Sequence, residues 1–388
     1  MRILIVAARF PEPGHKGDQV RTWQQVELLA ERHQLTVLTA GAPSSSQARR
    51  ALEDVVDLVS VPAGATVRAL SAASSSARGR PVEVGWMMPR PAMARAVALA
   101  RLHDVALVST VRCLPRPLPV PVVLDHIDAL SANLAQRAQL ERHGALRWAA
   151  RIESRLLAEH ERRVASWVAA QIVVSRLDAE LLAPEPIPEV VPHVMAVVDY
   201  DPAAATRDID VIFTGDMRYP PNREAAVWLA GAIAPALRRR RPEVRVVVAG
   251  RAADRLGVTG VEVVSDVPDL RAVIRRARVA AVPLRSGTGV ANKLLEAAAA
   301  GAAVVASPRA GAASGLDVDT AADAESFAAA IDQLLADEDL RQDRAVAALA
   351  GLQDRRPEVV RAQLERILTA AAETRLTKQH RGSPARSV

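Results

Sequence analysis

Short apolar runs alternate with amphipathic segments along most of the chain. Residues 2–8 form the first apolar run, and a loop containing Gly and Pro follows at 10–18. A helical pattern at 19–32 then leads to a second apolar run at 35–39. Continuous runs of this length are typical of strands that are buried on both faces. The order strand, loop, helix, strand therefore predicts a βαβ unit.

The rest of the first half follows this pattern less regularly. Residues 40–90 fit no clear assignment, although 44–46 and 71–80 have the composition of loops. A segment at 129–164 that is rich in Ala, Leu, Arg and Glu predicts one or two helices, with Gly144 as a break. The other predicted elements are a helix at 92–102 and strands at 105–109, 120–125, 171–175 and 189–191.

The second half repeats the alternation more cleanly, with an apolar run before each helical segment. Such an order favours a second set of parallel strands with helices between them. The predicted strands are 210–215, 244–250, 261–264, 279–284 and 303–307, and the predicted helices are 222–239, 270–277, 290–300, 324–336, 339–352 and 358–373.

Two successive α/β halves of similar size predict two facing doubly wound, Rossmann-like domains. Sheets of this kind bind ligands at the carboxyl ends of their strands, so we expect the active site in a cleft between the domains. The predicted boundaries are 1–192 for the first domain, 193–207 for a linker, 208–374 for the second domain and 375–388 for a disordered basic tail.

The composition limits the possible partners. The 388 residues carry a net charge of +6, and all basic residues are Arg except Lys16, Lys293 and Lys378. Such a balance favours anionic ligands or anionic lipid surfaces. Aromatic residues make up 3%, which argues against stacking platforms for nucleic acid. The single Cys113 and the absence of a signal peptide predict a cytoplasmic protein, with peripheral contact at the inner membrane face left open.

The segment at 285–301 has the features of an anion site. It follows a predicted strand, and Gly287 and Gly289 allow the backbone to approach a ligand just before a helix begins. Lys293 lies in the first turn of this helix, and Glu296 lies one turn later on the same face. A cation near phosphate and an acid one turn deeper suit a nucleotide. The alternative is a surface ion pair on an Ala-rich helix.

Other phosphate-binding motifs do not fit the chain. The glycines at 287–289 lack the third glycine of a dinucleotide fingerprint, and we find no ribose-binding acid about twenty residues later. No Gly-x-x-x-x-Gly-Lys-Ser/Thr sequence occurs, which excludes a P-loop.

Several segments together resemble the donor domain of a family 4 glycosyltransferase with the GT-B fold. In the second half they are FTGDMRYPPN at 213–222, VPDL at 267–270 and VPLRSGTGVANKLLEA at 282–297. In the first half, FPEPGHKGD at 10–18 and DHID at 125–128 are similar to the family's acceptor-domain loops.

The resemblance implies a donor site. In this family Lys293 would contact the diphosphate, Glu296 the ribose and Asp269 the region of the base, while Arg218 would share the phosphate charge. Thr288 departs from the family pattern, because it stands where the first Glu of a Glu-x7-Glu motif is expected. The predicted donor-binding residues are Gly17, Arg218, Asp269, Gly287, Thr288, Gly289, Asn292, Lys293 and Glu296.

The first half supplies the other residues that the resemblance implies. His126 would touch the donor sugar and, with Lys293 and Glu296, form the predicted catalytic set. We assign Lys16, Asp18 and Asp128 to the acceptor side. An ordinary βα loop at 16–18 and a structural histidine are the alternatives.

We therefore predict a retaining glycosyltransferase that moves a sugar from a UDP- or GDP-linked donor to a glycan, a lipid-linked intermediate or a small natural product. The family implies no metal and no further cofactor. A sugar-nucleotide epimerase of the same fold remains an alternative. A non-catalytic sugar-nucleotide-binding subunit is another, and Thr288 keeps it open.

The Arg-rich segment at 135–163 has two interpretations. With Trp148, it could dock on a membrane surface that carries a lipid-linked acceptor. Glutamates are interspersed at 141, 153, 159 and 161, and this favours a solvated bundle helix with Glu–Arg pairs.

Overall fold

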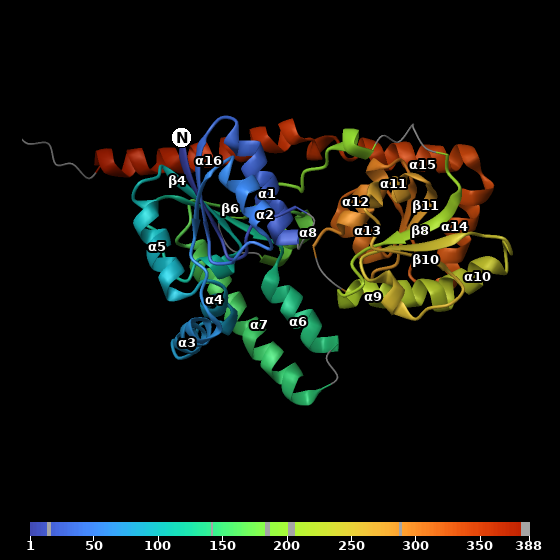
Figure 1. Cartoon of the computed structure of the whole chain (residues 1–388), viewed down its shortest axis with the longest axis horizontal. Helices are drawn as coiled ribbons and strands as arrows, with labels where there is room; N and C mark the ends of the chain where they lie inside the picture. The colour runs from blue at the N-terminus through green and yellow to red at the C-terminus, as the bar shows by residue number, and fades with distance from the viewer. Residues whose placement is uncertain (14–16, 141–142, 183–186, 201–205, 287–288, 382–388) are drawn as a thin grey trace, which may run out of the picture. The chain divides into compact units, whose positions relative to one another are not determined.

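The chain divides into two compact units, which the computed structural model in Figure 1 shows with their helices and strands. Unit 1 comprises Met1–Val194 together with Glu358–Val388, and unit 2 comprises Met195–Pro357. The structure describes residues 1–13, 17–140, 143–182, 187–200, 206–286 and 289–381.

Unit 1 is built on a seven-stranded parallel sheet. Its strand order is β3-β2-β1-β4-β5-β6-β7. The chain first adds β2 and β3 on one side of β1, and it then adds β4 to β7 on the other side. Ile3 pairs with Leu35 on one side and with Val105 on the other. The strands are β1 (Arg2–Ala7), β2 (Gln34–Thr39), β3 (Asp57–Ser60), β4 (Val105–Ser109), β5 (Val122–Ile127), β6 (Ala170–Val173) and β7 (Glu189–Val190).

Both faces of this sheet are covered, because successive side chains of a strand point to opposite faces. Ile3 and Ile5 pack in a cluster with residues of α1, α2 and α16, whereas Leu4 and Val6 pack with residues of α5 and α7. The helices of unit 1 are α1 (Gly17–Ala30), α2 (Ser46–Glu53), α3 (Ala65–Ser76), α4 (Val82–Met87), α5 (Arg90–Ala100), α6 (Leu130–Leu140), α7 (Gly144–Ala165), α8 (Arg176–Leu182) and α16 (Pro357–Arg381), with a short 3-10 turn at Val111–Cys113.

Unit 2 repeats the architecture with a six-stranded parallel sheet of order β10-β9-β8-β11-β12-β13. β8 and β11 are neighbours in this sheet, although they lie far apart in the sequence. The strands are β8 (Ile209–Thr214), β9 (Val246–Gly250), β10 (Glu262–Ser265), β11 (Ala277–Val282), β12 (Ala303–Ala306) and β13 (Asp319–Thr320).

The helices of unit 2 also form two layers. Phe213 packs on the face covered by α9, α10 and α14, and Ile212 packs on the face covered by α11, α12 and α15. The helices are α9 (Pro220–Trp228), which continues through a π turn (Leu229–Ile233) into α10 (Ala234–Arg238), then α11 (Leu270–Arg275), α12 (Asn292–Ala299), α13 (Pro308–Ser314), α14 (Ala324–Ala336) and α15 (Glu338–Ala350), with short 3-10 turns at Val197–Tyr200, Ala253–Leu256 and Gln353–Arg355.

The predicted α/β class with two parallel sheets is confirmed. The break between the helices of the 129–164 segment falls next to Gly144, as expected. The loop predicted at 71–80 is wrong over its first half, because α3 continues to Ser76 and buries Ser71, Ala72 and Ser75. Serine composition alone did not reveal a helix that is held by packing.

The predicted end of the second domain at residue 374 needs correction. Helix α16 belongs to unit 1, where Val360, Leu364 and Ile367 are buried in the same cluster as Ile3 and Ile5. This apolar stripe covers the sheet of unit 1. The helix also continues to Arg381, into the segment that was predicted to be a disordered tail.

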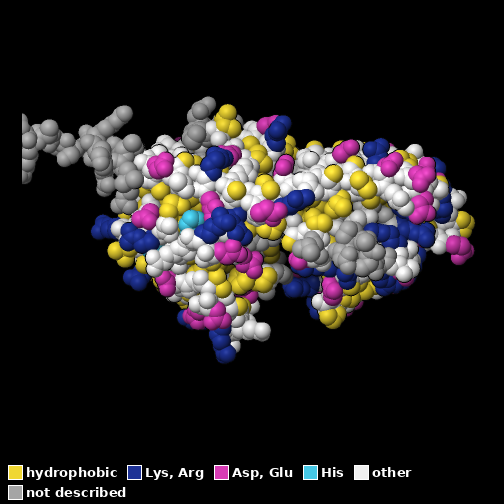
Figure 2. All heavy atoms as spheres, turned by 90° about the horizontal axis from the view of Figure 1, so that it is seen from above, with side chains coloured by type: hydrophobic (Ala, Val, Ile, Leu, Met, Phe, Trp, Pro, Cys, Tyr) yellow, Lys and Arg dark blue, Asp and Glu magenta, His cyan; other side chains and the backbone are white. Residues whose placement is uncertain are grey.

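Many arginines form surface ion pairs. Asp208 pairs with both Arg245, at 2.7 Å, and Arg276, at 2.5 Å, and Arg278 pairs with Asp210 at 3.2 Å. Figure 2 shows basic and acidic side chains interspersed over the visible face. Net charge alone therefore does not mark a binding surface on this face.

Helices α6 and α7 pack side by side as a hairpin that projects from unit 1 (Figure 1). Glu161 of α7 fixes the start of α6, because its carboxylate accepts hydrogen bonds from Ser131 N at 3.1 Å and Ser131 Oγ at 2.5 Å. Burial raises the pKa of Glu161 to about 7, and nearby Asp128 acts in the same direction. The hairpin is thus anchored by a buried acid that ionises near neutral pH.

Glu161→Gln should stabilise the protein at high pH. The pKa of the folded state lies above the ordinary value, so the stability that protonation supplies is present at low pH and is lost as the pH rises through about 7. We expect the variant to raise the free energy of unfolding by about 1–3 kcal/mol at pH 8.5 and to change it little at about pH 4, below the ordinary pKa of a glutamate, as measured by urea unfolding. Glu159→Gln, on the exposed side of the same helix, is the control; an equal effect at both pH values would contradict the prediction.

Candidate functional site

The carboxyl ends of β8 and β11 bring two predicted motifs together in unit 2. β8 leads into the loop 215–219 and then α9, and β11 leads into a loop that ends where α12 begins at Asn292. Because the two strands are hydrogen-bonded neighbours in a parallel sheet, both loops leave the same edge. The structure therefore joins segments that lie about seventy positions apart in the sequence.

Lys293 is held at this edge by Asn222. Its Nζ donates a hydrogen bond of 2.8 Å to Asn222 Oδ1, and Asn222 Nδ2 in turn donates to the carbonyl of Asp216 at 3.0 Å. The ammonium also lies 5.7 Å from the centre of the Phe213 ring, within the range of a cation–π contact. An ammonium has three donors, so two have no hydrogen-bond partner among the described residues.

The site is electrostatically coupled as well as enclosed. Burial lowers the pKa of Lys293 to about 8, although Glu296 opposes this change. Burial raises the pKa of Glu296, against the opposing charges of Lys293 and Arg271. Each group is thus poorly solvated and depends on the other for its charge, which is a common feature of functional sites.

Two further residues near Glu296 have no motif that would reveal them in the sequence. Arg271 of α11 stacks over the Tyr200 ring, with Cζ 5.2 Å from its centre, and pairs with Asp199 at 3.1 Å. Burial and then the charge of Glu296 raise the pKa of the Tyr200 hydroxyl. Tyr200 lies within the segment that was predicted to be a linker, so no helical or strand pattern points to it.

Asn292 and Gly289 flank the beginning of α12. The side-chain oxygen Oδ1 of Asn292 is buried and accepts no hydrogen bond from any residue that the structure describes. Gly289 has φ = 74°, a conformation that favours glycine. The predicted contacts Gly287 and Thr288 lie outside the described residues. An unsatisfied buried acceptor one residue before Lys293 is a suitable partner for a ligand hydroxyl.

Arg218 and Asp269 make local contacts. Arg218 pairs with Asp216 at 2.5 Å, and this pairing holds the pKa of the Asp216 carboxyl below its usual range. Asp269 caps α11 by accepting a hydrogen bond from Ala272 N at 3.2 Å. Both side chains are exposed, so their predicted contacts with a nucleotide stay predictions.

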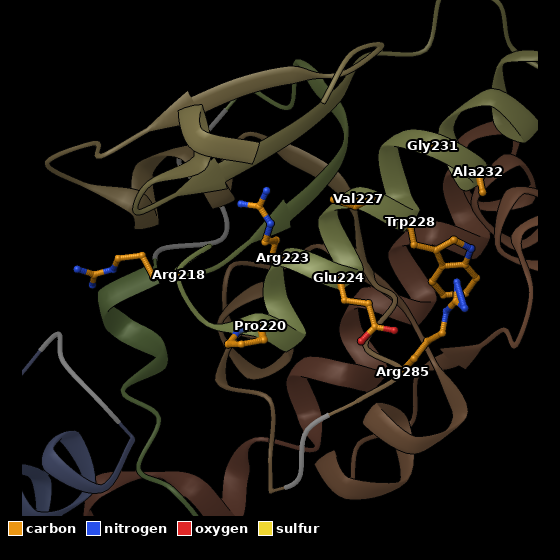
Figure 3. Close-up of a pocket in the computed structure, with 9 residues that line it drawn as sticks. All are labelled: Arg218, Pro220, Arg223, Glu224, Val227, Trp228, Gly231, Ala232 and Arg285. Carbon is orange, nitrogen blue, oxygen red and sulfur yellow. The ribbon is translucent and has the colours of Figure 1, made fainter. Parts of the chain in front are cut away.

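A shallow cavity of about 600 Å³ lies along α9 (Figure 3). Arg285 stacks on Trp228 there, with Cζ 3.9 Å from the ring centre, and Ser286 donates to Glu224 at 2.7 Å. Figure 3 shows the Arg218 side chain directed away from Arg285 and Trp228. The lining residues are Arg218, Pro220, Arg223, Glu224, Val227, Trp228, Gly231, Ala232 and Arg285.

His126 is fully buried in unit 1. Its Nε2 lies 2.8 Å from Gln171 Oε1, and its Nδ1 has no hydrogen-bond partner. Burial lowers the pKa of His126, so the ring is neutral at physiological pH. In this structure the side chain is therefore not accessible to a sugar, although its unpaired nitrogen leaves one polar contact open.

The preceding residue, Asp125, connects several segments at the carboxyl end of β5 by hydrogen bonds. Its carboxylate accepts from Arg21 Nε at 2.5 Å, from Gln25 Nε2 at 2.5 Å and from Ile127 N at 3.0 Å. Arg21 Nη2 also donates to Val191 O at 3.0 Å. The buried ion pair of Arg21 and Asp125 links α1, β5 and the residue that follows β7. The resemblance to the glycosyltransferase family implied no role for this pair.

The predicted acceptor residues make contacts of their own. Asp18 pairs with Arg9 at 2.6 Å, and Asp128 accepts from Asn133 Nδ2 at 2.6 Å. Gly17 begins α1, and a Cβ at that position would meet no atom within 4 Å, so sterics do not require a glycine there. Lys16 lies outside the described residues.

Comparison with known proteins gives a family match for part of the second unit. The sequence model of the family described as "Glycosyl transferases group 1" matches residues 208–337. The match lies within unit 2, which is called the group 1 unit below. A comparison with curated protein sequences gave no match.

Solved structures confirm the GT-B fold for the chain that carries this group 1 unit. HepE of Anabaena in complex with UDP superposes with a TM-score of 0.66 at 16% identity, over 95% of this chain and 100% of that one. WaaG, a glycosyltransferase of lipopolysaccharide biosynthesis, gives 0.61 at 16% identity over 95% and 100%. The trehalose 6-phosphate synthase of Burkholderia multivorans gives 0.61 at 15% identity over 96% and 99%. The predicted resemblance to GT-B glycosyltransferases is confirmed, and the assignment to family 4 stays a prediction.

Gly215→Ala should disturb the Lys293–Asn222 pair in the group 1 unit. A Cβ on Gly215 would lie 2.7 Å from Asn222 Nδ2 and 3.3 Å from Lys293 Cε. We expect thermal unfolding to show a loss of about 1–3 kcal/mol, as is typical of overpacked sites. Gly231→Ala, at a helical position with no atom within 4 Å, is the control and should not destabilise the unit. Equal stability of the two variants would show that the site tolerates the added methyl group.

Proposed function

We propose that the protein is a retaining glycosyltransferase that uses a nucleoside diphosphate sugar as donor. The observation that carries this proposal is the Lys293 ammonium, which Asn222 holds at the carboxyl edge of the group 1 sheet, in the first turn of α12. HepE, which shares the fold, has been crystallised with UDP, with UDP and glucose, and with UDP-glucose. A uridine diphosphate sugar is therefore the first donor to test, and a GDP-linked sugar is the second.

The arrangement around Lys293 suits a departing diphosphate. When the bond between the sugar and the diphosphate breaks, negative charge accumulates on the phosphate oxygens. The fixed ammonium and the positive end of the α12 dipole both act on this charge, and neither has to reorganise during the reaction. Because the charge grows toward the transition state, these groups stabilise that state more than the bound donor.

Glu296 and Asn292 supply acceptors for hydroxyl groups of the donor. Glu296 lies one helical turn beyond Lys293, which suits hydrogen bonds from a ribose when the diphosphate lies at Lys293. The unpaired Oδ1 of Asn292 can accept from a hydroxyl of the ribose or of the transferred sugar. A ligand hydroxyl that donates to Asn292 removes the unfavourable burial of an unsatisfied acceptor.

In unit 1, the proposal assigns Asp18 and Asp128 to the acceptor, with a glycan, a lipid-linked intermediate or a small natural product as the acceptor class. For His126, a contact with the donor sugar requires a change that exposes the ring, since the ring is fully buried in this structure. The proposal includes no metal ion and no organic cofactor.

Replacing the ammonium should abolish transfer. We expect Lys293→Ala to lower the rate by at least about a hundredfold, the scale on which loss of a single electrostatic contact acts. Arg239→Ala, an exposed position of the same unit that pairs with Glu325, is the control and should keep full activity. The assay is conversion of UDP-glucose with a panel of acceptors, and NMR of the product determines whether the anomeric configuration is retained. Unchanged activity of Lys293→Ala would refute the site.

Two outcomes of this assay favour other functions. Conversion of the donor without any acceptor indicates an epimerase. Tight donor binding without turnover across the panel indicates a non-catalytic binding subunit. An inverted anomeric configuration leaves the transferase function standing but overturns the retaining mechanism.

Donor affinity should fall as the pH rises through about 8. Lys293 has a pKa of about 8, so its ammonium is largely present at pH 7 and largely lost at pH 9. Isothermal titration calorimetry with UDP-glucose should therefore show weaker binding at pH 9 and uptake of protons near pH 8. Lys293→Arg keeps its charge over this range, so the affinity that remains should not depend on pH. A pH-independent affinity of the natural protein would contradict this prediction.

A further inference from the structure

The tip of the α6–α7 hairpin exposes large apolar side chains. Trp148 is 67% exposed and Leu146 is 59% exposed. Both lie in the first turns of α7, at the end of the hairpin that is farthest from the sheet of unit 1 (Figure 1), and residues 144–151 are called the tip below. Trp148 is one of only five tryptophans in the chain. Neither side chain belongs to the buried core, and exposed apolar side chains close together on a projecting tip mark a candidate contact surface.

Unpaired arginines accompany these apolar groups. Arg151 and Arg155 lie three and seven positions after Trp148, so all three share one face of the helix. Arg147 stands between the two exposed apolar residues. In the part of the chain that the structure describes, none of these three arginines forms an ion pair. Among the described residues, the start of α7 therefore combines exposed apolar groups with arginines that form no ion pair.

In the described part of α7, the Glu–Arg ion pairs lie near the base of the hairpin. There Glu159 pairs with Arg162 at 2.9 Å and with Arg163 at 3.5 Å. Residues 144–155 contain three arginines and one acid, Glu153, whose carboxylate accepts a hydrogen bond from Glu83 N of α4. Among the described residues, the Glu–Arg pairs that the sequence predicted for this segment thus occur at its base, and Glu141 lies outside those residues.

We propose that the tip of this hairpin docks on an anionic lipid bilayer. Trp at the interface and Arg directed at lipid phosphates are the side chains that favour such a surface. A stable protein partner would need a contact of about 800 Å² on each side. A projecting tip with two apolar side chains offers far less, whereas insertion among lipid headgroups needs only a few residues. No described helix is long and apolar enough to cross a membrane, so the contact is made at the surface.

Vesicle binding tests this proposal without a donor or an acceptor, so its outcome is separate from that of the transferase assay. The full chain is sedimented with vesicles of phosphatidylcholine, alone or with one quarter phosphatidylglycerol, at low and high salt. We expect binding to the anionic vesicles only, weakened by salt. The chain offers a matched pair of double variants: Leu146→Ser with Arg147→Ser at the tip, and Arg101→Ser with Leu102→Ser at the end of α5, where Leu102 is 61% exposed.

The partition coefficient of the tip variant between anionic vesicles and water should be lower by about tenfold or more. Loss of one arginine near an anionic surface lowers it by about fivefold, and loss of the leucine lowers it further. The control variant should bind as the natural protein does. Trp148→Ala is a second test and should also bind more weakly. Equal binding by the tip and control variants, or no binding of the natural protein to anionic vesicles, overturns the proposal. Light scattering that shows an oligomer of the natural protein but not of the tip variant overturns it in favour of contact between two copies of the chain.

Discussion

The candidate site depends on a hydrogen bond between the first turns of two helices of unit 2, α9 and α12. Lys293 Nζ and Asn222 Oδ1 lie 2.8 Å apart, and they belong to segments that follow neighbouring strands. The amide of Asn222 is itself held by the Asp216 carbonyl, so the ammonium has a fixed position before any ligand binds. The space for this arrangement exists because Gly215 has no side chain. Preorganisation of this kind allows one lysine to act strongly on a phosphate charge.

Unit 1 contains a comparable arrangement at its own sheet edge. The buried pair of Arg21 and Asp125 connects the first helix to the fifth strand, and Asp125 also accepts from the backbone of Ile127. Ile127 has φ = 67° and Thr110, at the end of the neighbouring strand, has φ = 68°. Such conformations are unfavourable for residues other than glycine and persist only where surrounding bonds hold them. The carboxyl edge of this sheet is therefore shaped by a buried network, and not by the loop glycine Gly17.

The sequence predicted those parts of the molecule that depend on local pattern. The parallel strands follow from the apolar runs. The helix that carries Lys293 follows from the glycines that precede it and from its Ala-rich sequence. Helix α16 shows the limit of this reasoning: its amphipathic pattern predicts a helix but cannot tell which sheet it covers. Asn222, Tyr200 and Arg271 show a second limit, because long-range packing brings them to Lys293 and Glu296. His126 shows a third, since a motif position gives the identity of a side chain but not its burial.

The two proposed binding surfaces differ in the physical property that marks them. At the donor site the signal is polar groups in an enclosed setting: the partly desolvated pair of Lys293 and Glu296, and the unpaired oxygen of Asn292. An unsatisfied buried acceptor costs about 1–3 kcal/mol, so the free protein is less stable there than it would be with a ligand bound. At the hairpin tip the signal is the reverse, with apolar Trp148 left in water. Each surface is unfavourable for the isolated chain, and our proposals give each a different partner: a hydroxyl-rich anion at the sheet edge and a lipid surface at the tip.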